Sequence, residues 1–274
     1  MDKMLVAVFE SESQASAAAG AMKDRCDDSA LLVYALAVIV RDVWGISVVD
    51  FTREKDCSHR ALGIATRSLI ELFDEPNHTV DDGNSDAITG AMMKMARAGV
   101  DAAFLDEVAR HLLPGRAAIV AEIEEMMATK IDILLESQGG IVFAYVRREN
   151  MDAEIARELD ALCSEIQILE SQLLRTADGS KAQLQEKMDL AKARFKATKE
   201  RASQIAASIK REAEAKIVWL QERAATASGG IKARIEGLAG EVRVDYVNRA
   251  TKLNLAWQFA GDVFAACARS SRLE

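Results

Sequence analysis

The sequence predicts an α+β protein in two parts, residues 1–150 and residues 151–274. In the first part, short apolar runs rich in Val, Ile and Leu alternate with amphipathic segments, which is the pattern of strands and helices. The second part has no proline and is rich in Ala, Glu, Lys, Arg and Leu, which favours long helices. The net charge also changes from −10 in the first part to +2 in the second, so we place the boundary near Asn150.

The first part contains the elements of a β/α domain in the order β-α-β-β-insert-α-β-α-β, which is ferredoxin-like with an insertion. Ser11 or Ser13 can cap the first helix and Asp101 the one that carries Phe104 and Val108. The predicted strands are Met4–Phe9, a run within Ala30–Asp42, Ile46–Phe51, 117–125 and Ile141–Val146. The last two strands flank a helix that starts at about Met126 and stops at Gly139.

A corner separates the Asp101 helix from the strand that follows it. Pro114 cannot continue a helix, and Gly115 allows a tight or left-handed turn. The chain has only two prolines, and the position of one of them here indicates a change in chain direction.

Residues 3–148 resemble the DUF1269 family of small bacterial proteins. The resemblance rests on "VAVF" with "ASAAAGAMKD", on "ISVVDF", on "GVDAAFLDEVARHLLPGRAAIVAEIEE" and on "LLESQGGIVFAYV". Family members are often described as membrane proteins and have a long apolar hairpin where this chain has residues 57–99. Here that insert carries many charges, which are costly to bury in lipid. We therefore expect two short helices with a polar tip at residues 74–86.

The second part shows apolar residues at the alternating four- and three-residue steps of a coiled-coil seam. We expect breaks near residues 177–180 and 228–230, where Gly and Ser gather, and a final helix from about Ile231. The predicted seam consists of Ile155, Leu159, Leu162, Ile166, Leu169, Leu173, Leu184, Met188, Phe195, Ile205, Ile209, Ile217 and Leu220. Helices with such narrow apolar stripes need a partner, which favours a helical hairpin and self-assembly.

No motif in the sequence predicts catalysis, a cofactor or a metal. Cys57 and His59 lack the second ligand pair of a zinc site, and His78 and His111 stand elsewhere. The acidic pairs Asp81–Asp82 and Glu124–Glu125 have no base or nucleophile patterned beside them. The glycine pairs at 139 and 229 lack the strand-loop-helix setting of a phosphate loop. We therefore expect no catalytic, cofactor-binding or metal-binding residues.

Two segments could contact other molecules. Residues 180–216 have a net charge of +5. The residues that could bind an anionic surface are Lys192, Arg194, Lys196, Lys199 and Arg201. The residues that could pack in an oligomer core or contact a membrane surface are Leu253, Trp257, Phe259, Val263 and Phe264. The near absence of aromatic residues in the basic segment gives little support for nucleic-acid binding.

These observations together predict a non-catalytic, self-assembling scaffold protein that forms a homo-oligomer. The alternatives are a peripheral membrane protein that binds anionic lipid, and a ligand-sensing regulatory module. The four scattered cysteines and the absence of a signal-peptide pattern indicate a cytoplasmic setting, with membrane association under the first alternative.

Overall fold

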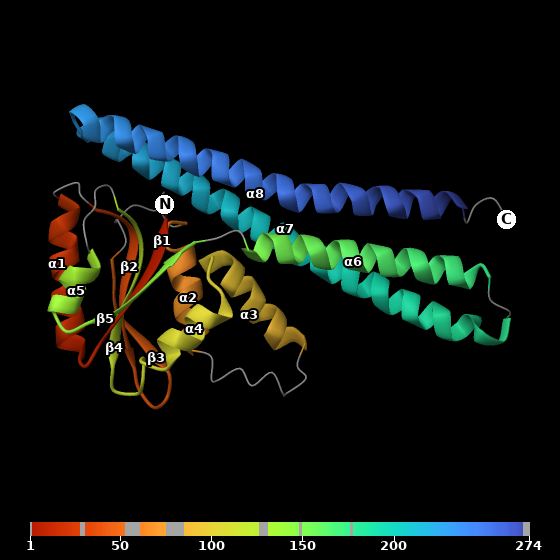
Figure 1. Ribbon diagram of the computed structural model, residues 1–274, viewed down its shortest axis with the longest axis horizontal. Coiled ribbons are helices and arrows are strands. Elements are labelled where there is room, and N and C mark those ends of the chain that lie inside the picture. Colours follow the sequence, from red (N-terminus) through yellow and green to blue (C-terminus); the bar gives the residue numbers. More distant parts are fainter. Residues whose placement is uncertain are drawn as a thin grey trace. The chain divides into compact units, whose positions relative to one another are not determined.

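The computed structural model describes the backbone of residues 2–27, 31–52, 61–74, 85–125, 131–147, 150–175 and 178–270 (Figure 1). Side chains are described for the same residues except 26–27, 52, 85–89, 150–151, 153–154, 178–179 and 253–270. The chain forms two compact units. The first contains Met1–Arg148 with Ser208–Val244, and the second contains Glu149–Ala207 with Asp245–Glu274.

The first unit is built on a five-stranded antiparallel sheet with the strand order β3-β2-β4-β1-β5. The strands are β1 (Lys3–Phe9), β2 (Leu31–Arg41), β3 (Ile46–Thr52), β4 (Ala117–Glu125) and β5 (Ile141–Val146). All five predicted strands are therefore present, within one or two residues of their expected ends. The central strands β1 and β4 are buried on both faces, which explains why they appear in the sequence as almost continuous apolar runs.

Helices α1 (Glu12–Asp27) and α5 (Ile131–Ser137) cover one face of the sheet (Figure 1). The side chains of α1 that face the sheet are Ala15, Ala18, Ala19 and Met22, all buried against apolar residues of the central strands. Their small size lets the helix lie close to the strands. Helix α5 lies within the predicted helix, and the expected residues 126–130 lie outside the described part of the chain.

Helices α2 (Ile64–Asp74), α3 (Ser85–Ala98) and α4 (Ala102–Ala109) lie on the other face (Figure 1). Asp101 caps α4 as predicted, because its carboxylate accepts a hydrogen bond from Phe104 N at 2.9 Å. The insert contains two helices, α2 and α3, and its polar tip over residues 75–84 lies outside the described residues. The predicted corner is also present. Gly115 has φ +89°, and its amide donates to Arg41 O at 2.7 Å.

Three long helices make up the rest of the chain, namely α6 (Asn150–Leu173), α7 (Asp178–Thr226) and α8 (Gly229–Ser270). The expected breaks near residues 177–180 and 228–230 correspond to the ends of these helices. The first unit takes in the second half of α7 and the first half of α8 together with the sheet. The change in composition near Asn150 therefore does not coincide with the border between the compact units, because parts of α7 and α8 belong to the first unit.

The start of α8 and the end of α7 pack on the same face of the sheet as α2 and α4. Leu32 and Tyr34 of β2 meet Trp219 and Leu220 of α7 and Ile235 of α8 in one apolar cluster. Tyr34 lies at a bulge in β2. The register of β2 against β4 shifts between residues 33 and 35, so no residue of β4 lies directly opposite Tyr34.

Candidate functional site: a buried ionic cluster under helix α7

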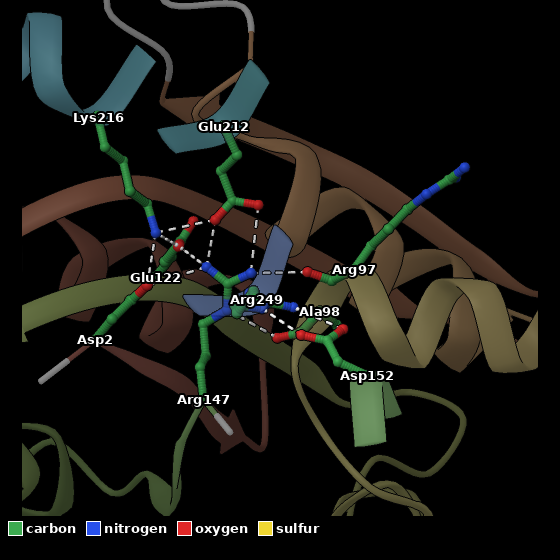
Figure 2. A network of polar contacts seen from close by, with 9 residues as sticks. All are labelled: Asp2, Arg97, Ala98, Glu122, Arg147, Asp152, Glu212, Lys216 and Arg249. Carbon is green, nitrogen blue, oxygen red and sulfur yellow. Dashed lines mark hydrogen bonds and ion pairs between the residues drawn. The ribbon is translucent and has the colours of Figure 1, made fainter. Parts of the chain in front are cut away.

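Five charged side chains from four distant segments of the first unit meet above the sheet (Figure 2). Asp2 precedes β1, Glu122 lies within the central strand β4, and Arg147 directly follows β5. Glu212 and Lys216 are four residues apart on α7 and therefore face the same way. We call these five residues the ionic cluster. Its members are almost entirely buried except Asp2, whose side chain is 27% exposed.

The geometry of the ionic cluster is unusually regular. One oxygen of each carboxylate contacts both Nη1 of Arg147 and Nζ of Lys216. Asp2 Oδ2 lies 3.0 Å from the Arg147 nitrogen and 2.5 Å from the Lys216 nitrogen. Glu212 Oε1 lies 2.9 Å from the Lys216 nitrogen and also accepts a hydrogen bond from Arg147. Glu122 Oε1 likewise accepts from both cations, at 2.5 Å from Arg147.

Arg147 also joins the ionic cluster to the end of α3. Its Nη2 donates to Arg97 O at 2.8 Å and its Nε to Ala98 O at 3.1 Å. These carbonyls belong to the last turn of α3, where a cation is favourable to the helix dipole. The Arg97 side chain itself points away (Figure 2).

Gly99 makes this approach possible. Its φ is +70°, and a Cβ at this position would stand 3.1 Å from the side chain of Arg147. The glycine that ends α3 is therefore required both by the backbone and by the guanidinium.

An aromatic wall closes one side of the ionic cluster. The ammonium of Lys216 lies 4.8 Å from the centre of the Tyr34 ring, and that ring packs at 5.3 Å against Trp219. Burial is the main reason that the pKa of the Tyr34 phenol is raised above its usual range. Tyr34 therefore stays neutral and supports Lys216 through its ring face.

The three carboxylates exceed the two cations by one negative charge, and the excess falls on Glu122. Burial raises the pKa of Glu122 to about 8, and the attraction of Lys216 only partly offsets it. Its Oε2 is buried and has no hydrogen-bond partner among the described residues, so only Oε1 contacts the two cations. Glu122 consequently holds a proton at neutral pH, which brings the ionic cluster to zero net charge.

The other members of the ionic cluster keep their charges. Burial works to raise the pKa of Glu212 and Asp2, but Arg147 and Lys216 lower both pKa values below the usual range. Burial alone would lower the pKa of Lys216 and Arg147, but the carboxylates around them raise both pKa values. The ionic cluster is therefore held by two charged acids and two charged bases around one neutral acid.

This arrangement holds a proton and fastens α7 to the sheet. The three carboxylate oxygens lie within 4.8 Å of one another, close enough to be metal ligands. Both cations, however, stand within hydrogen-bond distance of all three oxygens, in the place that a metal ion would take. A metal would have to expel two buried cations, so the residues present fit an ion-pair core better than a metal centre.

A second set of ion pairs links the helices of the second unit. Arg249 on α8 donates to Asp152 on α6 at 2.6 Å, and Asp152 is fully buried (Figure 2). Arg201 on α7 donates to Glu158 on α6 at 3.0 Å, and Thr198 on α7 donates to the same carboxylate at 3.0 Å. These contacts fix how the three helices of this unit align.

Most of the predicted seam is buried within the single chain. The buried residues are Ile155, Leu159, Leu162, Ile166, Leu169, Met188, Phe195, Ile205, Ile209 and Leu220. The half-buried ones are Leu173, Leu184 and Ile217. Because the seam packs inside the chain, its side chains are not available as an outer surface for a second copy.

The other predicted contact residues have mixed placements. Arg194, Lys196 and Lys199 are exposed on α7, whereas Lys192 pairs with Glu170 at 3.4 Å and Arg201 pairs with Glu158. Leu253, Trp257, Phe259, Val263 and Phe264 lie on α8, but their side chains are outside the described residues. The same holds for Cys57, His59, His78 and the pair Asp81–Asp82. His111 packs against the ring of Phe143 at 5.2 Å.

The ionic cluster was not predicted from the sequence. Glu124 and Glu125 were noted there only as an acidic pair without a base or nucleophile beside it. In the structure Glu124 is 4% exposed, while Glu125 pairs with Lys3 at 2.8 Å. A signal was present, because Glu122 and Glu124 alternate with apolar residues in a strand that is otherwise buried on both faces. Glutamates at such positions must have buried partners.

Comparison of the chain with family models, with curated proteins and with solved structures gives no match. Among the described residues, no helix combines the length and apolar character needed to cross a membrane.

Proposed function

We propose that this chain is a non-catalytic scaffold protein that assembles with copies of itself. The observation that carries the proposal is a set of large apolar side chains that stay exposed on the long helices, and at the turn after α6, once the seam is buried. They are Ile168 (56% exposed), Leu174 (79%), Leu190 (61%), Val244 (60%) and Val247 (51%). Apolar residues exposed in such number along helices favour a protein partner.

A ferredoxin-like core and a helical-hairpin region of coiled-coil type are part of this proposal. Without β3, the strand order β2-β4-β1-β5 and the α1 and α5 connections follow the split β-α-β pattern of that fold. The alternating steps of the buried seam support the coiled-coil packing of α6 and α7. We also keep the resemblance to the DUF1269 family and the cytoplasmic setting as proposals.

The ionic cluster supports a mechanical role for α7. Its charges are directed at one another, so they are suited to holding a helix in place. The hollow of about 500 Å³ between α7 and α8 is lined by small and aliphatic residues together with Gln221, Lys232, Glu236 and Arg243. No nucleophile stands beside a base among its lining residues, so it does not favour catalysis.

The first test is the mass of the full-length protein, measured by light scattering after gel filtration, with negative-stain microscopy of the same peak. We expect regular particles of several copies or more. The variant Leu174→Lys with Leu190→Lys should lower the mass, because it puts charge on the exposed helix surface. Gln185→Lys, at an exposed position of α7 like Leu190, serves as the matched control. A monodisperse wild-type monomer would overturn the proposal.

One observation favours the membrane alternative. Val43 and Trp44 are 76% and 93% exposed at the tip of the β2–β3 hairpin. The tip is held firmly, since Asp42 Oδ1 accepts from Trp44 N at 2.6 Å and from Gly45 N at 2.9 Å. An exposed tryptophan on a rigid turn suits a lipid interface. Salt-sensitive flotation with anionic liposomes that is lost in Trp44→Ser would support this alternative.

A further inference from the structure

The five-stranded sheet has two outer strands, β3 and β5. In the part of the chain that the structure describes, β3 pairs only with β2, and β5 pairs only with β1. An outer strand presents unpaired backbone donors and acceptors along its free side, and proteins commonly protect such strands from pairing with other chains. The two strands differ sharply in this protection.

Strand β3 is protected in two ways. Its register against β2 shifts at Val49, which is the position of a β-bulge. The next residue, Asp50, carries a charge and forms an ion pair with Lys23 at 3.0 Å. Bulges and charges both discourage a further strand from adding to an edge, so β3 is poorly suited to pairing.

Strand β5 has neither device. Its six residues, Ile-Val-Phe-Ala-Tyr-Val, include no charge and no proline. Its register against β1 runs without a shift from Ile141 to Val146. Ile141 is 41% exposed and Ala144 is also exposed, so apolar side chains stand at the edge. The preceding helix α5 adds Ile133, which is 53% exposed.

We propose that β5 pairs antiparallel with β5 of a second copy of this chain, across a two-fold axis, and so joins the two sheets into one. The inference rests on the proposed self-assembly and names the strand that mediates it. An uncharged strand is complementary to itself, and a contact of a surface with its own copy closes as a symmetric pair. A second strand would add a ladder on the side of β5 that faces away from β1, where no further strand pairs among the described residues.

The geometry places the axis at the middle of the strand. Residues opposite each other in an antiparallel pair point to the same side of the sheet. The two-fold axis must therefore pass between a residue and its own copy in the second strand, and the middle of Ile141–Val146 allows Phe143 or Ala144 as that residue. In both registers Ala144 lies opposite its own copy or diagonally across from it. A lysine here would bring two like charges to within ~5–8 Å, the spacing of direct and diagonal neighbours.

The test compares Ala144→Lys with Ala144→Thr in the full chain, by light scattering and sedimentation velocity. Because Ala144 is exposed, both variants should keep the wild-type circular dichroism spectrum. We expect Ala144→Lys to reduce the assembly mass by half or more, and Ala144→Thr to leave it unchanged. Ile141→Lys is the second variant at the same edge and should act like Ala144→Lys. Val48→Lys on β3 should have no effect, since that exposed position lies on the protected edge.

The outcomes separate this inference from the proposed function. An assembled wild type whose mass is unchanged by both β5 lysine variants would overturn the pairing and leave self-assembly standing. Disruption by Val48→Lys in place of the β5 variants would also overturn it, because β3 would then be the contact strand. A monomeric wild type would overturn both proposals together.

Discussion

Glu122 makes the stability of the first unit depend on pH in an unusual direction. Carboxylates paired with cations commonly have lowered pKa values, but burial raises that of Glu122 to about 8. Between the ordinary glutamate pKa of about 4.5 and this value, the folded state holds one proton that the unfolded state has released. The free energy of unfolding therefore decreases as the pH rises through this window, by about 1.4 kcal/mol per pH unit.

The variant Glu122→Gln tests this reasoning, because glutamine resembles the protonated acid and cannot ionise. From pH 5 to pH 7.5 the wild type should lose roughly 3 kcal/mol through this group, whereas the variant should lose none of it. Urea unfolding at a series of pH values, followed by tryptophan fluorescence, gives the two free-energy curves. Trp219 reports on the correct unit because it is buried beside the ionic cluster. Above pH 8 the variant should be the more stable protein.

Glu125→Gln is the matched control. Glu125 lies on the same strand but forms a partly exposed pair with Lys3, so its removal should leave the wild-type slope between pH 5 and pH 7.5. Below about pH 4 the wild type and Glu122→Gln should both lose stability. The lowered pKa values of Asp2 and Glu212 favour the folded state only while these groups are ionised. Parallel curves for wild type and Glu122→Gln from pH 5 to pH 7.5 would refute the reasoning.

Three further changes test the contacts around the ionic cluster and in the second unit. Arg147→Ala should lower the free energy of unfolding by about 3–5 kcal/mol because it leaves buried carboxylates without their partner, and an unchanged urea midpoint would contradict this. Gly99→Ala should cost about 1–2 kcal/mol, measured by thermal unfolding, because its φ of +70° disfavours a side chain. Asp152→Ala should cost about 3–5 kcal/mol by the same measurement, because it strands buried Arg249; Asp160→Ala, at an exposed site on α6, should change little.

The secondary structure was largely predictable because it depends on local pattern. The apolar run of β1, the Asp101 cap and the Pro114–Gly115 corner each act within a few residues, and all three appear where the sequence places them. The two helices of the insert were expected from the resemblance and from the charges of this segment, and α2 and α3 are found there. Element ends differed by one residue, as at the start of β1 and the end of β3.

The partners of the long helices were not predictable from the same patterns. A heptad seam indicates that a helix needs an apolar partner but does not say whether that partner is the same chain or another copy. Leu159 and Ile205 are buried inside the chain, so the predicted seam is already used. Likewise, nothing local indicates that the end of α7, from Ser208 onward, belongs with the sheet.

By itself, the sequence determined the α+β class, the order and type of the elements and the apolar faces of the helices, since these depend on residue spacing along the chain. Only the tertiary structure decided that Asp2, Glu122, Arg147, Glu212 and Lys216 form one ionic cluster. The physical reason is that a buried charge requires a partner of opposite sign but places no condition on where in the sequence that partner stands. Segments up to 214 residues apart meet here, as Asp2 and Lys216 do, and only the packing of α7 on the sheet brings them together.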